Sequence, residues 1–190
     1  MIATHLWWFV ARSGGLVSWV LLSASVLWGL ALSTKSFRGT VRPNWMLDLH
    51  RFLGALAVIF TVIHVAALML DTTVKFGLSE VLVPFAAKWH PLAVAWGIVG
   101  LYLLLAVELS SLIRKQLSKR VWRAIHFASF PLFFVATAHG LSAGTDTSNR
   151  GVLWATVTVT VAVVGMTALR VYQATREPEP SKPRIGVRVR

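Results

Sequence analysis

The sequence contains no cysteine among its 190 residues. Without cysteine, the chain cannot form disulfides, iron–sulfur clusters, thiolate-ligated haem or zinc sites with cysteine ligands. Any metal or cofactor that it binds must therefore rely on histidine, aspartate, glutamate, methionine or backbone groups.

Charged residues are also scarce. They make up 14% of the chain, whereas soluble domains average about 25%. Hydrophobic residues make up 56%, and nine tryptophans are present, a residue that favours the membrane–water interface. This composition predicts an integral membrane protein. The net charge of +12 is unevenly distributed along the chain, which favours membrane orientation over nucleic-acid binding.

Five segments are long and apolar enough to cross a bilayer, which requires about 20 residues. They cover residues 6–32, 45–70, 91–113, 121–141 and 152–172. Residues 71–90 carry several charges and a proline, and we expect a short interfacial helix there. The fold class predicted is an all-α bundle of five transmembrane helices, with one domain at residues 1–175. Residues 176–190 are basic and proline-rich, which predicts a disordered cytoplasmic tail.

Lysine and arginine residues in short loops predict the orientation of the bundle. All but four of the 19 lie at the first and third connections or after the fifth segment. The four on the other side are Arg12, Lys75, Lys88 and Arg150. This asymmetry predicts that the N-terminus faces outside and the C-terminus faces the cytoplasm. The second and fourth helices would then run in the same direction.

Four of the six histidines lie in these two helices. His50 and His64 are 14 residues apart, and His126 and His139 are 13 residues apart. At 1.5 Å per residue, the separations along the helix axes are about 21 Å and about 19–20 Å. His50 should therefore lie level with His126 on the cytoplasmic side, and His64 level with His139 on the outer side.

Two imidazoles at each of two depths fit two b-type haems, each with one histidine from each helix. Such ligation fills both axial positions and favours electron transfer over substrate binding at iron. On a straight helix, however, His126 and His139 would point about 140° apart. We expect Pro131 to cause a bend or wide turn that brings both rings inward.

Other interpretations of the histidines remain open. The same four residues fit a membrane transporter of protons or metal ions. They also fit a non-catalytic, haem-holding subunit of a larger redox complex. For His5 and His90, which lie at the ends of spans, an ordinary interfacial role is expected.

Haem propionates are carboxylates and bind arginine. Arg51 and Arg123 are candidates near the inner site, and Arg12 is a candidate near the outer site, where Asp71 and Asp146 are alternative partners. Glu108 is expected to pair with Arg123 or Arg114, or to take up a proton. Close helix or porphyrin approach is possible at a further set of positions: Gly14, Gly15, Gly54 and Gly140.

Three segments of the sequence resemble the ferric-reductase-like transmembrane domain, which occurs in NADPH oxidases, iron reductases and the membrane subunit of the methionine-sulfoxide reductase system. The segments are ARSGGLVSWVLLSASVLWGL, DLHRFLGALAVIFTVIHVA and RAIHFASFPLFFVATAHGLSAGTDT. The chain is most similar in character to short, stand-alone actinobacterial members. The resemblance extends over about residues 6–172, and the histidine spacing is its most specific part.

The resemblance implies two haem b groups. His50 and His126 would ligate the inner iron, and His64 and His139 the outer iron. The chain shows no Gly-rich dinucleotide loop, so we expect an electron-transfer subunit of an oxidoreductase without its own flavin or NAD(P) domain. Its donor would be a separate flavoprotein or a quinol, with a bound flavin or quinone as a further option. The acceptor would lie at the outer face, and the protein in the lipid of a bacterial plasma membrane.

Overall fold

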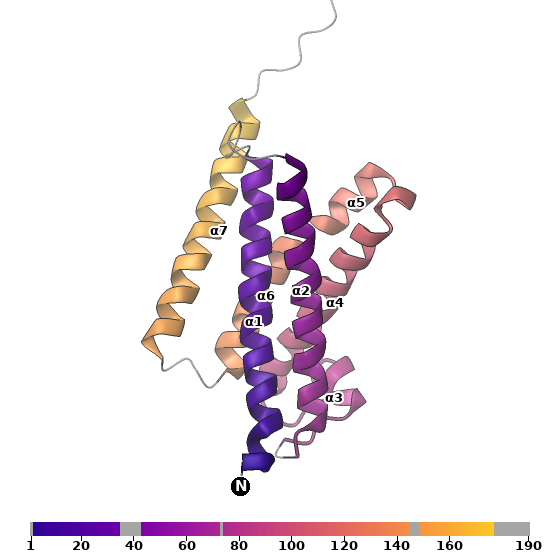
Figure 1. Ribbon diagram of the computed structural model, residues 1–190, viewed down its shortest axis with the longest axis vertical. Helices are drawn as coiled ribbons and strands as arrows, with labels where there is room; N and C mark the ends of the chain where they lie inside the picture. Colours follow the sequence, from indigo (N-terminus) through magenta and orange to yellow (C-terminus); the bar gives the residue numbers. More distant parts are fainter. Residues whose placement is uncertain (1, 35–42, 73, 145–148, 177–190) are drawn as a thin grey trace, which may run out of the picture.

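The computed structural model describes residues 2–34, 43–72, 74–144 and 149–176. Within these ranges the chain forms helices and no strand (Figure 1). The elements are α1 (Ile2–Ser33), α2 (Pro43–Leu70), α3 (Leu78–Leu82), α4 (Pro91–Leu112), the 3-10 helix η1 (Arg114–Gln116), α5 (Lys119–His126), α6 (Ser129–Ala143) and α7 (Arg150–Arg176). The tail predicted at residues 176–190 lies, apart from Arg176, outside the described residues.

Five helical segments are long and apolar enough to cross a membrane. They are α1, α2, α4, α7 and the combined segment of α5 and α6, Lys119–Ala143. Large apolar side chains on their outer surfaces are exposed, for example Leu112 at 79% and Trp154 at 67%. Such a surface is stable in contact with lipid and would be unusual in water. The predicted all-α membrane bundle is therefore confirmed.

The bundle is built from two close helix pairs. α1 packs along α2, and α4 packs along α6, while α7 lies against α1 on the side away from α2 (Figure 1). Since successive spans alternate in direction, α2 and α6 run the same way, each beside an antiparallel partner. In this view α6 passes behind α1 and α2, and α5 lies to the right of α2.

The fourth span is interrupted between its two histidines, as the sequence predicts. α5 ends at His126 and α6 begins at Ser129, and the amide of Ala128 donates to the carbonyl of Ile125 at 2.9 Å in a tighter turn. The break lies one turn before Pro131, not at the proline itself. Proline clashes with the carbonyl four residues earlier, here that of Phe127. Pro131 itself lies in the first turn of α6, where its missing amide hydrogen is not required.

The main core lies midway between the ends of α2 and α6. Ala57 and Phe133 are both completely buried there. Ala57 is halfway between His50 and His64 in sequence, and Phe133 is close to the midpoint of His126 and His139. The other members of the cluster are Leu22, Val26, Leu30, Leu104, Leu132 and Val163. Apart from Leu30, which follows Gly29 at the level of His50, these side chains form an apolar layer between the two histidine levels.

The connection between α2 and α4 contains the expected short helix, α3. Phe76 and Val81 from this connection are buried against Val94 and Ile98 of α4. The hydroxyl of Tyr102 donates to the carbonyl of Leu82 at 2.6 Å and ties α3 to α4. The connection is thereby held against one end of the bundle.

Glu80 supports the start of α3. Its carboxylate accepts hydrogen bonds from the hydroxyl of Ser79 at 2.8 Å and the amide of Gly77 at 2.9 Å. These bonds, first that from Ser79, lower the pKa of the Glu80 carboxyl because they favour its charged form.

Gly14 controls the approach of α1 to α2. A Cβ added at Gly14 would lie 3.4 Å from the backbone nitrogen of His64 and 3.5 Å from the carbonyl oxygen of Phe60. We expect Gly14→Ala to be tolerated, whereas Gly14→Leu should force the helices apart. Overpacking of this kind costs about 1–3 kcal/mol in the free energy of unfolding. For a chain of this size that lowers the thermal midpoint by roughly 2–12 °C.

The measurement is thermal unfolding of the purified protein in detergent, followed by tryptophan fluorescence. Gly165→Leu in α7 is the matched control, since a Cβ at Gly165 would meet nothing within 4 Å. Equal midpoints for Gly14→Leu and Gly165→Leu would contradict the close α1–α2 contact.

Candidate functional site

The structure brings the four intramembrane histidines together in two pairs. The ring centres of His50 and His126 are 6.0 Å apart, and those of His64 and His139 are 6.3 Å apart. The interplanar angle is 77° in both pairs. Each pair has one ring from α2 and one from the α5–α6 span. The depth matching predicted from the spacing of 14 and 13 residues is therefore present in the fold.

Three of these rings are fixed by a hydrogen bond to the backbone of a neighbouring helix. Nδ1 of His64 lies 2.6 Å from the carbonyl oxygen of Ala11, and Nδ1 of His50 lies 3.1 Å from that of Ser25. Nδ1 of His139 lies 2.8 Å from the carbonyl oxygen of Ala93. Since a carbonyl only accepts, Nδ1 carries the hydrogen in each of these three bonds, and Nδ1 of His50 also lies 3.2 Å from the hydroxyl oxygen of Ser25. The lone pair of Nε2 is then free for another partner.

A glycine makes each of these carbonyls accessible. In a helix, the side chain of residue i+4 lies over the turn that contains residue i, because Cβ points toward the N-terminus. Gly15 follows Ala11 by four residues, and the same spacing relates the two other acceptors to Gly29 and Gly97. A Cβ at Gly15 would lie 2.9 Å from Nδ1 of His64, which is too close.

The other two glycines are also close to the ring that they face, Gly97 more so than Gly29. A Cβ at Gly97 would lie 2.7 Å from Cε1 of His139, and a Cβ at Gly29 would lie 3.2 Å from Cε1 of His50. Sequence reasoning singled out Gly15 but missed Gly29 and Gly97. The repeated spacing of a small residue and a glycine four positions later, AxxxG or SxxxG, is the signal that could have identified them.

The distances fit a metal ion held between two imidazoles. A metal–nitrogen bond is about 2.0–2.1 Å long and the ring centre lies about 1 Å behind the nitrogen, so two opposed rings have centres about 6 Å apart. Within the described ranges, no group of three or more histidine, aspartate or glutamate residues could hold a metal ion. A pair of protein ligands suits haem iron, whose four remaining ligands come from the porphyrin.

A cavity surrounds the His64–His139 pair. Its volume is about 510 Å³, and its lining is mostly apolar. It reaches from Trp19 and Thr137 in the interior to Glu80 and Trp89 in the connection around α3. An apolar space lined by two histidines suits a hydrophobic cofactor.

Hydroxyl groups line the interior beside this cavity. The hydroxyl oxygens of Ser18 and Thr61 are 2.7 Å apart and lie 3.0 Å and 2.8 Å from the carbonyl oxygen of Ala57. Because each hydroxyl has one hydrogen, one of them donates to the other, which donates to Ala57. Trp19 donates from its indole nitrogen to the hydroxyl of Thr137 at 2.9 Å. These contacts tie α1 to α2 and to α6. No local sequence pattern marks which hydroxyls face another helix, so these contacts could not be predicted from the sequence.

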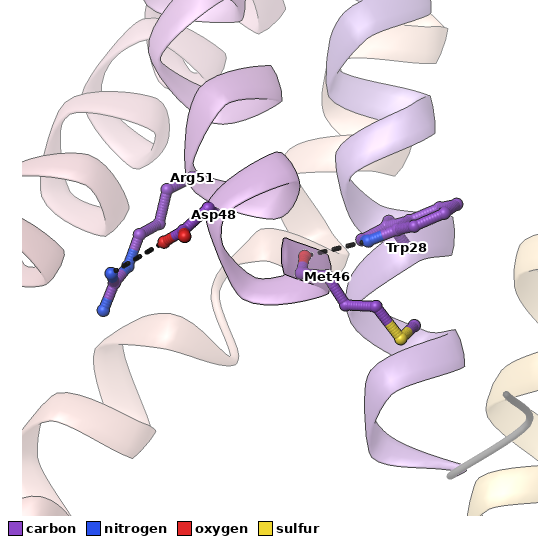
Figure 2. Close-up of polar contacts among 4 residues, drawn as sticks. All are labelled: Trp28, Met46, Asp48 and Arg51. Atoms are coloured by element: carbon purple, nitrogen blue, oxygen red, sulfur yellow. Dashed lines mark hydrogen bonds and ion pairs between the residues drawn. The ribbon is translucent and has the colours of Figure 1, made fainter. Parts of the chain in front are cut away.

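The three candidate arginines have different surroundings. Arg12 lines the cavity together with His64 and His139, and its guanidinium lies 4.9 Å from the ring centre of Trp8. Arg51 is exposed on α2 and forms an ion pair with Asp48 at 3.5 Å, pointing away from α1 (Figure 2). Arg123 is exposed on α5. A site role for each of the three remains a prediction.

The contacts in Figure 2 show how α2 begins beside the end of α1. The indole nitrogen of Trp28 donates to the carbonyl of Met46 at 2.9 Å. This bond uses a carbonyl near the start of α2 and joins the two helices one turn before His50. It helps to keep His50 in register with Ser25 and Gly29.

The structure also describes the surroundings of Gly54, Gly140 and His90, which the sequence singled out. The Glu108 carboxylate packs against Gly54, so this glycine allows a side chain, and not a helix, to approach. A Cβ at Gly140 would meet nothing within 4 Å, so no close approach of protein requires glycine there. His90 is exposed, with φ at 41° and its ring centre 4.5 Å from that of Trp89. The side chain of His5 lies outside the described residues, as does Asp146.

The chain was compared with protein families, with curated proteins and with solved structures. The family described as "Ferric reductase like transmembrane component" matches residues 14–137, which is more than half of the chain. Three of the paired histidines fall inside this range, and His139 lies two residues beyond it. No curated protein and no solved structure matched.

Domains of this family generally bind haem, and the match indicates electron transfer across a membrane as the general activity. The resemblance seen in the sequence is thereby confirmed. The chain belongs to the ferric-reductase-like transmembrane family.

Proposed function

We propose that the protein is a di-haem b cytochrome that carries electrons across the membrane. The observation that supports this proposal is the repeated geometry of the two histidine pairs, with ring centres 6.0 Å and 6.3 Å apart at two levels of one bundle. The levels are about 20 Å apart along the helices. Two redox centres at these levels divide one long transfer into shorter ones.

His50 and His126 would hold one haem, and His64 and His139 the other. Bound haem supplies a one-electron iron couple. The four histidines would hold the two groups, and the bonds at Nδ1 of His50, His64 and His139 would fix the orientation of these rings and raise their basicity as ligands. The apolar layer around Ala57 and Phe133 would limit the access of water between the two levels.

Arginines would hold the propionates. Arg12 is the candidate at the His64–His139 level, since it lines the same cavity as these histidines. Arg51 and Arg123 are the candidates at the other level. Their exposed guanidinium groups lie in the same helices as His50 and His126, and can bind carboxylates that reach the surface.

The distribution of lysine and arginine supports a direction for the transfer. With the His50–His126 level at the cytoplasmic face, electrons would enter there from a separate flavoprotein or a quinol, and leave at the outer face to an acceptor. A bound flavin or quinone is a further possible component. The plasma membrane of a bacterium is the proposed location.

The haem content tests the proposal. We expect the purified protein to carry about two haem b groups per chain by the pyridine haemochrome assay. His64→Ala and His50→Ala should each lose one group and keep the other, because the pairs are separate sites. His90→Ala is the control and should keep both. A colourless wild-type protein would refute the proposal and favour a transporter.

Gly97 provides a second test, which concerns the hydrogen bond between His139 and the carbonyl of Ala93. Gly97→Val should push the ring of His139 away from the carbonyl of Ala93, since even a Cβ would lie 2.7 Å from Cε1. Loss of such a supporting bond typically lowers metal affinity by about 10–100-fold. We expect Gly97→Val to bind one haem normally and the other weakly in a haem titration. Gly165→Val should titrate like wild type, and the same result for Gly97→Val would contradict this role of the glycine.

The orientation can be tested because the chain lacks cysteine. Lys88→Cys and Gln116→Cys each introduce one thiol at an exposed position, the first just before α4 and the second just after it. In intact cells, a membrane-impermeant maleimide should label Lys88→Cys only, and permeabilised cells should show labelling of both. Labelling of Gln116→Cys alone in intact cells would reverse the proposed direction.

A further inference from the structure

His126 is the one ring of the four without a bond at Nδ1. Its Nδ1 is buried and has no hydrogen-bond partner anywhere in the described part of the chain. The corresponding atoms of His50, His64 and His139 each lie within 3.1 Å of a backbone carbonyl. A supporting bond of this kind holds a histidine in one orientation and strengthens it as a ligand. His126 lacks both effects.

His126 also lies at the break in its span. It is the last residue of the eight-residue helix α5, and α6 begins at Ser129. His139, in contrast, lies within the continuous helix α6. The His126 ring can therefore shift with the end of α5 while the helix that carries His139 stays in place.

A stacked tryptophan holds the His126 ring in place of a hydrogen bond. Trp122, one turn earlier in α5, stacks on it with ring centres 5.0 Å apart and an interplanar angle of 22°. The guanidinium of Arg114 lies 4.4 Å from the ring centre of Trp122. Stacking restrains a ring less strictly within its own plane than a hydrogen bond does, so it allows the imidazole to slide.

The stack also contains a second donor without an acceptor. Nε1 of Trp122 is buried and, over the described residues, has no hydrogen-bond partner. A buried donor without a partner is costly. Movement of Trp122 and His126 toward polar surroundings would relieve this cost for both groups, which makes displacement of His126 easier than displacement of a fully bonded histidine.

We propose that His126 is an exchangeable ligand and that its site takes a small, neutral π-acceptor molecule of the carbon monoxide type. This inference rests on the proposed function. In the exchange, the bond between ferrous iron and Nε2 of His126 breaks, and a bond between the iron and the incoming molecule forms. The iron stays ferrous, and His126 leaves as a neutral imidazole that keeps its hydrogen on Nδ1. The His64–His139 site, with both rings bonded at Nδ1, stays closed.

The experiment uses full-length protein loaded with haem, reduced with dithionite and exposed to carbon monoxide. The absorbance difference should correspond to about one bound molecule for every two haems. The double variant His64→Ala/His139→Ala keeps only the exchangeable site and should bind carbon monoxide. The double variant His50→Ala/His126→Ala keeps only the closed site and should not bind it under the same conditions.

Variants of Trp122 test the mechanism without removing a ligand. An aromatic stack contributes up to about 1.5 kcal/mol, so Trp122→Ala should accelerate carbon monoxide binding by about 3- to 10-fold. Trp122→Phe retains a stacked ring, so its rate of carbon monoxide binding should stay within about twofold of the wild-type rate. Trp154→Ala, at an exposed position on α7, is the control and should leave the rate unchanged.

Several outcomes would overturn the inference. A protein with two haems and no carbon monoxide binding would refute it and leave the di-haem proposal intact. Binding to the His50→Ala/His126→Ala protein, or an unchanged rate in Trp122→Ala, would also refute it. A protein that carries no haem would refute both the inference and the proposed function.

Discussion

The arrangement of the bundle depends on how an imidazole ring fits against the backbone of a neighbouring helix. A helical carbonyl normally lies beneath the side chain four residues later. Where that later residue is glycine, the carbonyl is open, and a histidine from the next helix can reach it. His64 does so at Ala11 and Gly15, with a distance of 2.6 Å between Nδ1 and the carbonyl oxygen.

The same arrangement occurs twice along α1, and this fixes the register of α1 and α2. Gly15 and Gly29 are 14 residues apart, as are the histidines that face them. A shift of either helix along the other would bury both donors without acceptors. The α4–α6 pair repeats the arrangement once, at Gly97 and His139. Its other end differs, since the span breaks after His126 and, among the described residues, that ring has no carbonyl partner at Nδ1.

The two ends of the bundle therefore carry the same kind of histidine pair with different support. A ring bonded at Nδ1 is both oriented and made more basic, while a ring held by stacking is only positioned. The apolar layer around Phe133 separates the two levels, so that each pair has its own surroundings. Under the proposed function, this difference gives one level a stable, closed site and the other a site that can exchange a ligand.

The sequence by itself determined the five spans, the family and the depth at which each histidine lies, since these follow from apolar run length and a fixed rise per residue. It also indicated the interruption of the fourth span, because 13 residues on a straight helix would turn His126 away from the face of His139. Only the tertiary structure decided where the break lies, one turn before Pro131, and which of several glycines face a ring. Gly29 and Gly97 have this role, while Gly140 has no close neighbour within 4 Å. The physical reason is that lipid covers the apolar outer surface of the bundle, so the sequence pattern does not distinguish outward from inward faces. The partner of each Nδ1 depends on contacts between helices that are distant in the chain.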